Sequence, residues 1–592
     1  MMIKNEKGYS LFITLVIVIL FTILGLSLMT LTMNGSTKND IRQDTVRAQD
    51  LSEKGMDYFV TDLEKKLTDF LGDTGRSRSA YVAELDRLLK EYKCDNKIST
   101  LTDTSTGSAE YCIETFTSTI DSAGKVNDLR KLVTIRSTGE ANSKDSITLT
   151  QVEIGADPYP DELNYAIGTN KEGDKKGNLF LHGGSEIKGD MKVEGNIITF
   201  EKAYSFSQWN ESILPRISPY NSTDKQANLV LMGKSYKLTS LTGLDYNKHI
   251  VANTFSTRNY TEKKDITELF ENGYAPRLVE RNPVKTTIEI TNQKDNFYYN
   301  YSTGVVQKNF YDLNKSQTIT EKDPSKAILV YQKAVEKCTG SGFNKKCTTE
   351  YQPEYDKNFK LTGTNSVYSL SSLGKLSIKE TGSLTLNRDP AGNYGTLYTK
   401  GLELGDQRDS NINDKRPTIS IDGSIFVEGN LDIKGADLET NAVIYVTGNV
   451  TIKYSTINGK NLTNGKKGSL IIFAKGNIEI SNNSIFASPD NPSRITGFFY
   501  SEGDFEMKGV GSNIIVDGGI SADNIVLNAI RGRANSQNDL EKATSQQKNY
   551  ADKSRLKVHY NPDIITTYSD LRQKEPIIYS INDSTEKSRE LK

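Results

Sequence analysis

Cysteine and histidine are the side chains that most often bind metals or carry nucleophilic and acid–base chemistry, and both are scarce in this sequence. Its 592 residues include three histidines, which counts against histidine catalysis and a histidine-ligated metal: His182, His249 and His559. The four cysteines form two close pairs, Cys94 with Cys112 and Cys338 with Cys347. No CxxC occurs and no His lies near either pair, so the spacing disfavours zinc. We expect two local disulfides in an oxidising exterior, with four free, partly buried thiols as the alternative.

Paired carboxylates are the other chemistry that the sequence could support, since two of them at a suitable separation hydrolyse glycosidic bonds. Five carboxylates of the second half are candidates: Asp422, Asp432, Glu479, Asp504 and Glu506. They occupy alternate polar positions of a repeated strand pattern, where a solvated strand face is the ordinary explanation. The sequence has no Walker loop, Rossmann fingerprint, HExxH motif or GxSxG elbow. We therefore expect a non-enzymatic protein with no cofactor and no metal, and a β-helix polysaccharide-active enzyme is the less favoured alternative.

Composition and length limit the class of protein that these residues could belong to. The formal net charge is −1, so the overall charge does not suggest a nucleic-acid partner. With 30 Tyr, 45 Gly and 14 Pro, the chain suits many short β-strands joined by turns. At 592 residues it is too long for one compact core, and two to four domains are expected.

The N-terminal region carries the strongest signal. Residues 11–33 read LFITLVIVILFTILGLSLMTLTM, without one charge. As a helix rising about 1.5 Å per residue, this run would span roughly 35 Å, enough for a hydrocarbon core of about 30 Å. A cleaved secretory signal would need a small-residue site after a shorter apolar core, and a lipoprotein would need a cysteine there; neither follows this run. We expect a single-pass membrane anchor with Lys4 and Lys7 cytoplasmic and the ectodomain extracellular.

An apolar rhythm continues beyond the uncharged run. Apolar or small residues recur every three or four positions, with charged and polar residues between them: Ala48, Leu51, Gly55, Phe59, Leu63, Leu67 and Phe70. This spacing predicts that the transmembrane helix continues as an amphipathic rod. An ordinary membrane anchor with a helical stalk would show the same rhythm and is the plain alternative.

Two short segments resemble those of type IV pilin-like proteins. The segment Lys7-Gly8-Tyr9-Ser10-Leu11 resembles a prepilin leader, in which a short basic tail and a Gly precede an aromatic residue and the apolar run. The resemblance implies that a membrane-embedded prepilin peptidase cuts between Gly8 and Tyr9. It also implies one long helix, half in lipid and half packed on a globular head.

The second segment lies in the amphipathic part. The sequence AQDLSEKG, which starts at Ala48, resembles the A-x-x-A-A-E-x-G signature of the PilX N-terminal family. Ala48, Glu53 and Gly55 match, whereas Leu51 and Ser52 replace two alanines. The resemblance covers about residues 1–65, roughly a tenth of the chain.

One departure from the pilin pattern bears on the role. Most major pilins have Glu at the fifth residue after the cut, which here is Ile13. A carboxylate inside lipid costs about 2.5–3.5 kcal/mol on insertion scales, so it persists only where it has a partner. In pilins that partner is thought to be the N-terminal ammonium of a neighbouring subunit. Family members without the Glu, such as the K-type pseudopilins, sit at the filament tip or initiate assembly, so Ile13 implies a minor, low-copy component.

Residues 72–155 are expected to form a small α+β domain. Ser79–Tyr92 reads as a helix, and residues 131–141 and 145–154 read as two strands separated by a polar turn. Cys94 and Cys112 flank a Ser/Thr-rich loop, and a bridge across a loop of this length contributes about 3 kcal/mol. The segment DPYPDEL at residues 157–163 is expected to be a linker, because its two prolines interrupt regular structure.

An imperfect repeat dominates the rest of the chain. Each copy has an apolar or small residue, a polar residue, Gly, then Asn, Asp or Gly, and then alternating apolar and polar residues; the copies begin at Val193, Val427, Val446, Ala474, Ser501 and Val516. We expect the Gly-Asn pairs to supply the positive φ of a tight corner and the alternation to give strands with one buried face. Such recurrence favours a β-solenoid over the alternative, a β-sandwich with glycine turns.

The repeat predicts the division of the ectodomain. First solenoid coils are expected at residues 163–200, an inserted region at 201–370, where the repeat is lost, and the β-solenoid again at 371–535. The inserted region holds Trp209, the second cysteine pair and a predicted helix at Asp265–Asn272. Residues 536–592 are expected to form a C-terminal cap and tail, in which a strand from Arg555 caps the last coil and the final residues DSTEKSRELK are disordered.

The predicted fold class is therefore mainly β. Residues 1–8 form a prepilin-like leader, and residues 9–71 form a long N-terminal transmembrane and amphipathic pilin-like α-helix. A small α+β domain follows, and then a right-handed β-helix or solenoid with a large insertion.

The resemblance and the repeat together imply a minor component, at the tip or initiating, of a type IV pilus-like or pseudopilus system, presenting the solenoid for adhesion or ligand contact. Its partners would be the membrane, other pilin-like subunits, the prepilin peptidase and a surface carbohydrate. A single-pass membrane-anchored adhesin or cell-envelope protein outside any filament is the alternative. A bactofilin-like cytoskeletal polymer shares the repeat style, but it would need neither the anchor nor the cysteines.

Overall fold

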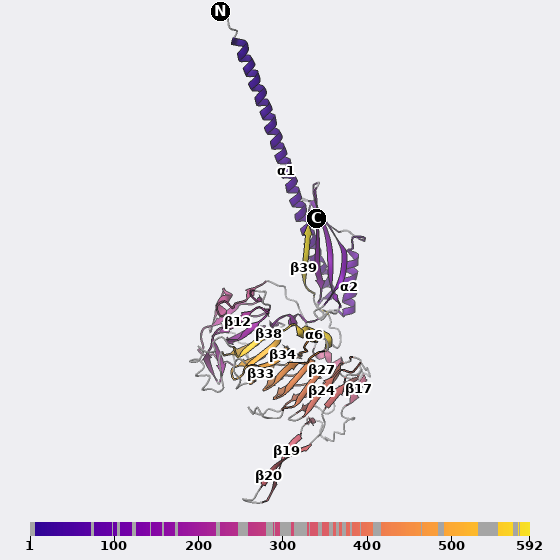
Figure 1. Ribbon diagram of the computed structural model, residues 1–592, viewed down its shortest axis with the longest axis vertical. Coiled ribbons are helices and arrows are strands. Elements are labelled where there is room, and N and C mark those ends of the chain that lie inside the picture. The colour runs from indigo at the N-terminus through magenta and orange to yellow at the C-terminus, as the bar shows by residue number, and fades with distance from the viewer. Residues whose placement is uncertain are drawn as a thin grey trace, which may run out of the picture. The chain divides into compact units, whose positions relative to one another are not determined.

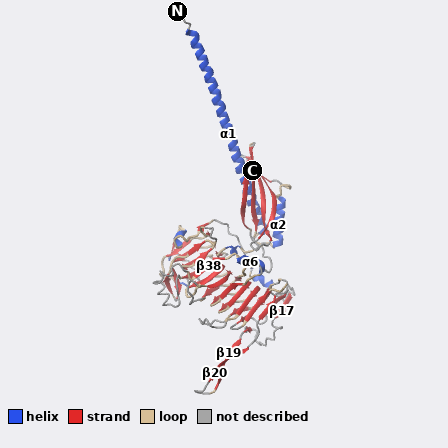
Figure 2. Ribbon diagram, viewed as in Figure 1, coloured by secondary structure: helices blue, strands red, loops and turns tan. Residues whose placement is uncertain are grey.

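The computed structural model describes residues 6–72, 76–96, 99–103, 107–120, 126–142, 144–156, 159–171, 176–205, 207–220, 225–244, 246, 259–279, 288, 290–296, 309–312, 328–330, 332–340, 346–353, 359–362, 366–369, 375–378, 382–390, 392, 394–405, 416–462, 465–483, 491–530, 554–571, 578 and 581–591. The chain divides into two compact units. Unit 1 comprises Met1–Asp157 and Pro576–Lys592, and unit 2 comprises Pro158–Glu575. The fold is mainly β with one long N-terminal helix, as predicted (Figures 1 and 2).

Unit 1 begins with α1, a continuous α-helix over Glu6–Leu71, drawn in indigo in Figure 1. Its N-terminal half is exposed, whereas its C-terminal half is buried along one stripe: Ala48, Leu51, Met56, Phe59, Leu63, Leu67 and Leu71. The spacing of apolar residues predicted this stripe, because residues three and four apart share one face of a helix. Phe70 is only partly buried and lies at its edge.

An antiparallel sheet of five strands completes unit 1 in the order β1-β2-β3-β4-β39. The strands are β1 (Ser99–Asp103), β2 (Gly107–Ile120), β3 (Val126–Ala141), β4 (Lys144–Gly155) and β39 (Asn582–Leu591). Alternate residues of β3 are buried along its length, as expected for a strand with one face on a core. Helix α2 (Arg78–Glu91) adds Tyr81, Leu85, Leu88 and Leu89 to that core. The sequence does not predict β1 and β2, because Ser- and Thr-rich residues such as those around them also suit a loop.

The predicted disorder of the final residues is wrong. Figure 1 shows β39 in yellow beside the purple strands of unit 1. Asn582 lies opposite Gly155 and Leu591 opposite Thr148, so the end of the chain is the edge strand next to β4. Its sequence is charged and lacks apolar alternation, so its order comes from the backbone ladder with β4, a partner far away in sequence.

Unit 2 is built from two extended sheets. In the described residues one has 18 strands and is called the wide sheet, and the other has 12 strands and is called the narrow sheet. The wide sheet contains β5 (Ile167–Thr169), β7 (Glu186–Lys188), β8 (Met191–Val193), β12 (Arg216–Ser218), β13 (Asn228–Leu231), β16 (Arg277–Leu278), β17 (Asn309–Asp312), β21 (Phe359–Thr362), β22 (Ser366–Ser369), β24 (Ser383–Asn387), β25 (Gly395–Thr399), β27 (Thr418–Val427), β29 (Asp437–Val446), β31 (Thr456–Gly459), β32 (Leu470–Ala474), β34 (Ser493–Ser501), β36 (Ile514–Ala522) and β38 (Leu556–Tyr560).

The narrow sheet contains β6 (Leu179–Gly183), β9 (Ile197–Phe200), β14 (Ser235–Leu238), β15 (Tyr260–Glu262), β18 (Ile328–Val330), β23 (Lys375–Ile378), β26 (Gly401–Leu404), β28 (Leu431–Lys434), β30 (Val450–Lys453), β33 (Ile478–Ser481), β35 (Phe505–Gly509) and β37 (Ile525–Ala529). Two hairpins stand apart, β10 (Lys202–Ser205) with β11 (Gln208–Glu211), and β19 (Gln332–Thr339) with β20 (Lys346–Pro353).

The chain alternates between the two sheets, and successive passes stack in register as coils. Val427 in the wide sheet pairs with Val446 of the next coil, and Leu431 in the narrow sheet pairs with Val450. These pairings are parallel, whereas β15 closes one end of the narrow sheet antiparallel to β14. The inward-facing Ile, Leu and Val side chains of both sheets form one continuous apolar core, which each coil could not bury alone.

The order of the coils in space differs from their order in the chain. The first coil lies in the middle of the stack, where Leu179 of β6 pairs with Ile525 of β37 and Ile167 of β5 pairs with Ile520 of β36. From there the chain winds outward through β9 and β14. It then starts again from β18 and β23 and winds back to β37 through β26, β28, β30, β33 and β35.

This order corrects two predictions. The region 201–370 is not an insertion throughout, because β12 and β13 pair with β7 and β8 and extend the stack. The strand from Arg555 does not cap an end, because β38 lies between β36 and β7, inside the stack. Both predictions depend on coils stacking in the order of the chain. The local sequence pattern predicts a coil but does not indicate which other coil lies next to it in the stack.

The Gly-Asn pairs of the repeat have a different role from the predicted one. Of the glycines in these pairs, Gly429 has a positive φ of 136°, but Gly448, Gly476 and Gly503 do not. A Cβ atom at any of these three would overlap the side-chain oxygen of the Asn in the preceding coil: Asn430, Asn449 and Asn477. Glycine is therefore required by close approach of a ladder of asparagines rather than by backbone conformation.

Short helices complete unit 2. The predicted helix at Asp265–Asn272 is a shorter 3-10 helix, η3 (Ile266–Leu269), in which Asp265 accepts a hydrogen bond from the Thr267 N–H. Two more 3-10 helices are η1 (Asp161–Asn164) and η4 (Thr291–Asn296). Helix α6 (Asp563–Leu571) was not predicted, and it lies on the outer face of the wide sheet over a row of aromatic residues: Tyr398, Phe426, Tyr445, Phe473 and Tyr500.

Candidate anchor and assembly region

The exposed half of α1 is the first part of the candidate region. Within the described residues, α1 is the one helix long and apolar enough to cross a membrane. Its apolar side chains are exposed all round, with Leu11 at 74% and Phe12 at 62%. The hydroxyl groups of Thr14, Thr22 and Thr30 donate hydrogen bonds to backbone carbonyls four residues earlier, so they need no water. A helix that is apolar on every side is suited to a hydrocarbon environment.

The predicted processing site lies at the start of this helix. Gly8 and Tyr9 are both within α1, and Tyr9 is 71% exposed. Ile13, at the position of the pilin glutamate, is likewise exposed, and the segment 11–33 supplies no carboxylate in its place. Lys4 of the predicted leader lies outside the described residues. Cleavage after Gly8 stays a prediction.

The buried half of α1 lies unusually close to the sheet, at the segment that resembles the PilX N-terminal signature. A Cβ atom at Gly55 would lie 2.6 Å from Ser137 Oγ and 2.8 Å from Ala109 Cβ. On the sheet side, a Cβ atom at Gly139 would overlap the backbone of α1 at Ala48. The Ser52 hydroxyl lies 2.6 Å from that of Thr148 on β4. The small residues of the signature therefore allow the helix backbone to rest directly on β2, β3 and β4.

The acidic residue of the signature faces the end of the chain. The Glu53 carboxylate lies 3.8 Å from the Arg589 guanidinium on β39, and Asp57 lies 3.7 Å from it. Arg589 is also paired with Glu586 at 2.6 Å. The sequence does not predict this contact, because Arg589 lies far from Glu53 along the chain, in a segment that lacks apolar alternation.

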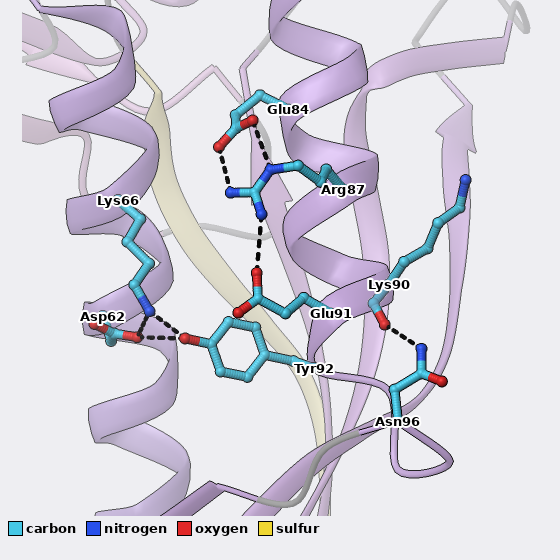
Figure 3. A network of polar contacts seen from close by, with 8 residues as sticks. All are labelled: Asp62, Lys66, Glu84, Arg87, Lys90, Glu91, Tyr92 and Asn96. Atoms are coloured by element: carbon cyan, nitrogen blue, oxygen red, sulfur yellow. Dashed lines mark hydrogen bonds and ion pairs between the residues drawn. The ribbon is translucent and has the colours of Figure 1, made fainter.

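A polar network joins the end of α1 to the end of α2 (Figure 3). The Lys66 ammonium donates to Asp62 Oδ2 at 2.6 Å and to the Tyr92 hydroxyl, which in turn donates to Asp62 at 3.1 Å. Burial alone would lower the pKa of Lys66, but Asp62 and Tyr92 hold it above its usual value. Burial raises the pKa of Tyr92. The network fixes the chain just before Cys94.

Each cysteine pair is joined within its own segment. Cys94 is bonded to Cys112 on β2, and the Cys94 N–H donates to the Ile113 carbonyl at 3.1 Å. Cys338 and Cys347 are bonded across the β19–β20 hairpin, where they are opposite residues of the ladder. The first bridge thus joins the end of α2 to the sheet of unit 1, whereas the second closes one hairpin of unit 2.

The carboxylates considered for glycoside hydrolysis are held by basic neighbours. Asp432, Glu479 and Glu506 lie in one row on the outer face of the narrow sheet, and each has a lysine within 3.4 Å. Burial would raise the pKa of Glu479, but Lys453 and Ser481 hold it below its usual range. Glu506 also accepts a hydrogen bond from the Tyr246 hydroxyl at 2.7 Å, so each of the three carboxylates is paired with a neighbouring side chain.

The remaining two carboxylates have structural partners. Asp504 belongs to the asparagine ladder and accepts from Asn524 Nδ2 at 3.0 Å. Asp422 accepts from Arg388 and Asn441, both at 2.9 Å. Among the described residues, no three His, Cys, Asp or Glu side chains gather as a metal site would require.

The histidines do not form a catalytic group in the described part of the chain. His182 is fully buried beside Trp209, with the ring centroids 5.2 Å apart. His559 Nε2 lies 3.3 Å from Glu186 and, with Lys188 and Lys557, lowers the pKa of that carboxyl to about 2 although burial acts to raise it. His249 lies outside the described residues.

Comparisons with known proteins give little further guidance. No family model matches the chain, and no curated protein matches it. Among solved structures, the competence-associated pilin ComZ from Thermus thermophilus is similar at 11% identity and a TM-score of 0.21, with 93% of this chain and 97% of that chain covered. At this TM-score the similarity supports no conclusion about fold or function.

Proposed function

We propose that this chain is a minor, low-copy subunit of a type IV pilus-like or pseudopilus system, located at the tip or at the start of assembly. The observation that carries the proposal is the division of α1. Its uncharged half, residues 11–33, is exposed on all sides, and its second half, from Ala48 to Leu71, is packed on a sheet. A helix that is half membrane anchor and half core of a head is the plan that the resemblance of residues 1–65 implies.

Two features favour a terminal rather than a repeating position. Ile13 lacks the carboxylate that would pair with the N-terminal ammonium of a neighbouring subunit. Unit 2, Pro158–Glu575, is also far larger than unit 1. Subunits that repeat along a shaft lie close together, and such a large unit on each would be sterically crowded.

The proposed role of unit 2 is contact with a surface or a ligand, with its coils acting as a β-solenoid scaffold. A surface carbohydrate is the proposed ligand class, and the prepilin peptidase, the membrane and other pilin-like subunits are the proposed partners. The neutralised carboxylate row supports a non-enzymatic role. A membrane-anchored adhesin outside any filament is the second candidate. It would need the same two parts, an uncharged membrane-spanning segment and an extracellular β-rich part.

Labelling of cells with gold-conjugated antibody against unit 2 tests the proposal. We expect gold at one end of filaments and at the cell surface. Labelling along the whole shaft would contradict the terminal position, and labelling confined to the membrane would favour the second candidate. Protease added to intact, wall-stripped cells should remove unit 2 and the part of unit 1 that lies outside the membrane, and full protection would contradict the anchor with an external ectodomain.

A further inference from the structure

Strand β39 contacts both the sheet and the helix that form the core of unit 1. On one side β39 pairs with β4, from Asn582 opposite Gly155 to Leu591 opposite Thr148. On the other side it contacts α1: the Ser584 N–H donates to Glu64 Oε1 at 3.1 Å, and Arg589 lies within 3.8 Å of Glu53 and Asp57. The strand therefore ties the sheet edge to the helix.

All of unit 2 is inserted between two residues that face each other in this sheet. Gly155 ends β4 and Asn582 begins β39, and the two are paired. In the folded unit 2, Leu163 near the beginning of its chain and Leu571 near its end both pack into the apolar cluster on the outer face of the wide sheet. Strand β38, near the end of unit 2, also pairs with β7, near its beginning. Folding of unit 2 thus brings its two connections together.

This arrangement makes the pairing of β39 depend on the state of unit 2. The entropic cost of closing a flexible loop grows with its length, so an unfolded segment 156–581 strongly opposes the pairing of Gly155 with Asn582. Once unit 2 has folded, both of its ends are held on one face of the wide sheet, and they present β39 to β4 at a higher effective concentration than an unfolded segment would. The strand has little affinity of its own to compensate, because Thr585–Leu591 is exposed and its register with β4 is interrupted twice.

We propose that β39 is a strap that closes on β4 and α1 only after unit 2 has folded. Unit 1, which carries the membrane helix, is then completed after unit 2, by residues that follow unit 2 in the chain. A truncated or misfolded chain keeps an open edge at β4, where unpaired N–H and C=O groups would recruit other strands. The strap thus couples completion of unit 1 to the integrity of the whole chain.

Hydrogen exchange on the full-length chain in detergent tests the coupling. Ile444 is fully buried in the core of unit 2, and Ile444→Asp should unfold its coils. We expect the amides of Thr148–Glu153 that pair with β39 to exchange at least about tenfold faster in this variant, although no residue of unit 1 has changed. Glu439→Ala, an exposed position on the same strand, is the matched control and should leave exchange in both units unchanged.

The strap itself is tested by Thr585→Pro, which removes a ladder N–H from β39. It should accelerate the same β4 amides without affecting unit 2, and Glu590→Ala on the same strand should not. Ile472→Asp can be added if Ile444→Asp alone does not unfold unit 2. If the β4 amides stay protected from exchange while unit 2 is unfolded, the coupling is refuted. If Thr585→Pro leaves both β4 exchange and the stability of unit 1 unchanged, β39 is no strap.

Discussion

The side-chain oxygen of Asn524 accepts a hydrogen bond from the backbone N–H of Asn178 at 3.1 Å, although the two residues are 346 positions apart. This contact joins the last coil of the narrow sheet to the first. It continues a ladder in which Asn430 accepts from Asn449, Asn449 from Asn477, Asn178 from Asn196, and Asn196 from Lys234. Asparagine side chains thus satisfy the backbone of the next coil, across the junction as well as within each series. In one coil Asp504 takes the place of the asparagine and accepts from the Asn524 side chain instead.

The ladder should matter most at this junction. Asn524 is 2% exposed, so Asn524→Ala would leave the buried Asn178 N–H without its acceptor and lower the stability of unit 2 by about 1–3 kcal/mol. Asn449→Ala removes the same kind of bond at an exposed corner and should cost about 0.5–1.5 kcal/mol. Denaturant unfolding of the two variants measures the difference, and equal losses would contradict a special role for the junction.

Gly55 should tolerate no side chain. Gly55→Ala places a methyl group against Ser137 and Ala109, and overpacking of this kind costs about 1–3 kcal/mol, more than the helix propensity gained. Gly35 lies in the same helix, and a methyl group added there would have no described atom within 4 Å, so Gly35→Ala should be neutral or stabilise by up to about 1 kcal/mol. Thermal unfolding of unit 1 distinguishes them; a neutral Gly55→Ala would show that the helix can shift away from the sheet.

The stability of unit 2 should depend on pH through Glu162. Burial raises the pKa of this carboxyl from 4.5 to about 7. Between those two values the folded state keeps a proton that the unfolded state has lost. Stability therefore falls as pH rises through this window, by up to about 1.4 kcal/mol per pH unit, and stays lower above pH 7.

Glu162→Gln removes the titrating proton and should flatten this pH dependence, leaving unit 2 more stable than the unmodified protein above pH 7. Denaturant unfolding at pH 5, 6, 7 and 8 measures the slope. Glu439→Gln, at an exposed position of β29, should keep the original slope. An unchanged slope in Glu162→Gln would show that another group is responsible.

The two disulfides should differ in their effect on stability. Cys94–Cys112 closes 18 positions and joins α2 to the sheet, so replacing both cysteines by Ser should lower the stability of unit 1 by about 2–4 kcal/mol. Cys338–Cys347 closes 9 positions within one hairpin, and its loss should leave the unfolding of both units unchanged. Peptide mapping without reduction checks the pairing, and a cross-pair such as Cys94–Cys338 would contradict it.

Processing of the N-terminus is the prediction that separates a pilin-like subunit from a plain anchor. If a prepilin peptidase cuts the chain, the mature protein begins at Tyr9, and Gly8→Val should block the cut. Gly25→Val, later in the same apolar helix, should be cut normally. N-terminal sequencing decides the matter, and an intact Met1 or Met2 on assembled protein would favour the plain anchor.

Local patterns predicted local structure well and long-range pairing poorly. The uncharged run and the rhythm from Ala48 to Leu67 predicted α1, because both depend on residues three or four apart. The alternation after Val427 and Val446 predicted strands, but nothing near Leu179 indicates that it pairs with Ile525. In the anchor region, the sequence singled out Ala48, Glu53 and Gly55 but not their partners, Arg589 among them, because partners from the far end of the chain leave no local trace.

The pairing of Gly155 with Asn582 also determines how the protein would bear mechanical load. Tension between a membrane-held α1 and unit 2 would enter unit 1 through the adjacent ends of β4 and β39. The two connections would share this load, and β4 is held to the rest of the sheet by its long ladder with β3. Unit 2 is joined to unit 1 at both of its ends, so a single proteolytic cut would leave at least one of these two connections intact. The double connection thus makes unit 1 a mechanical clamp for the unit that it carries.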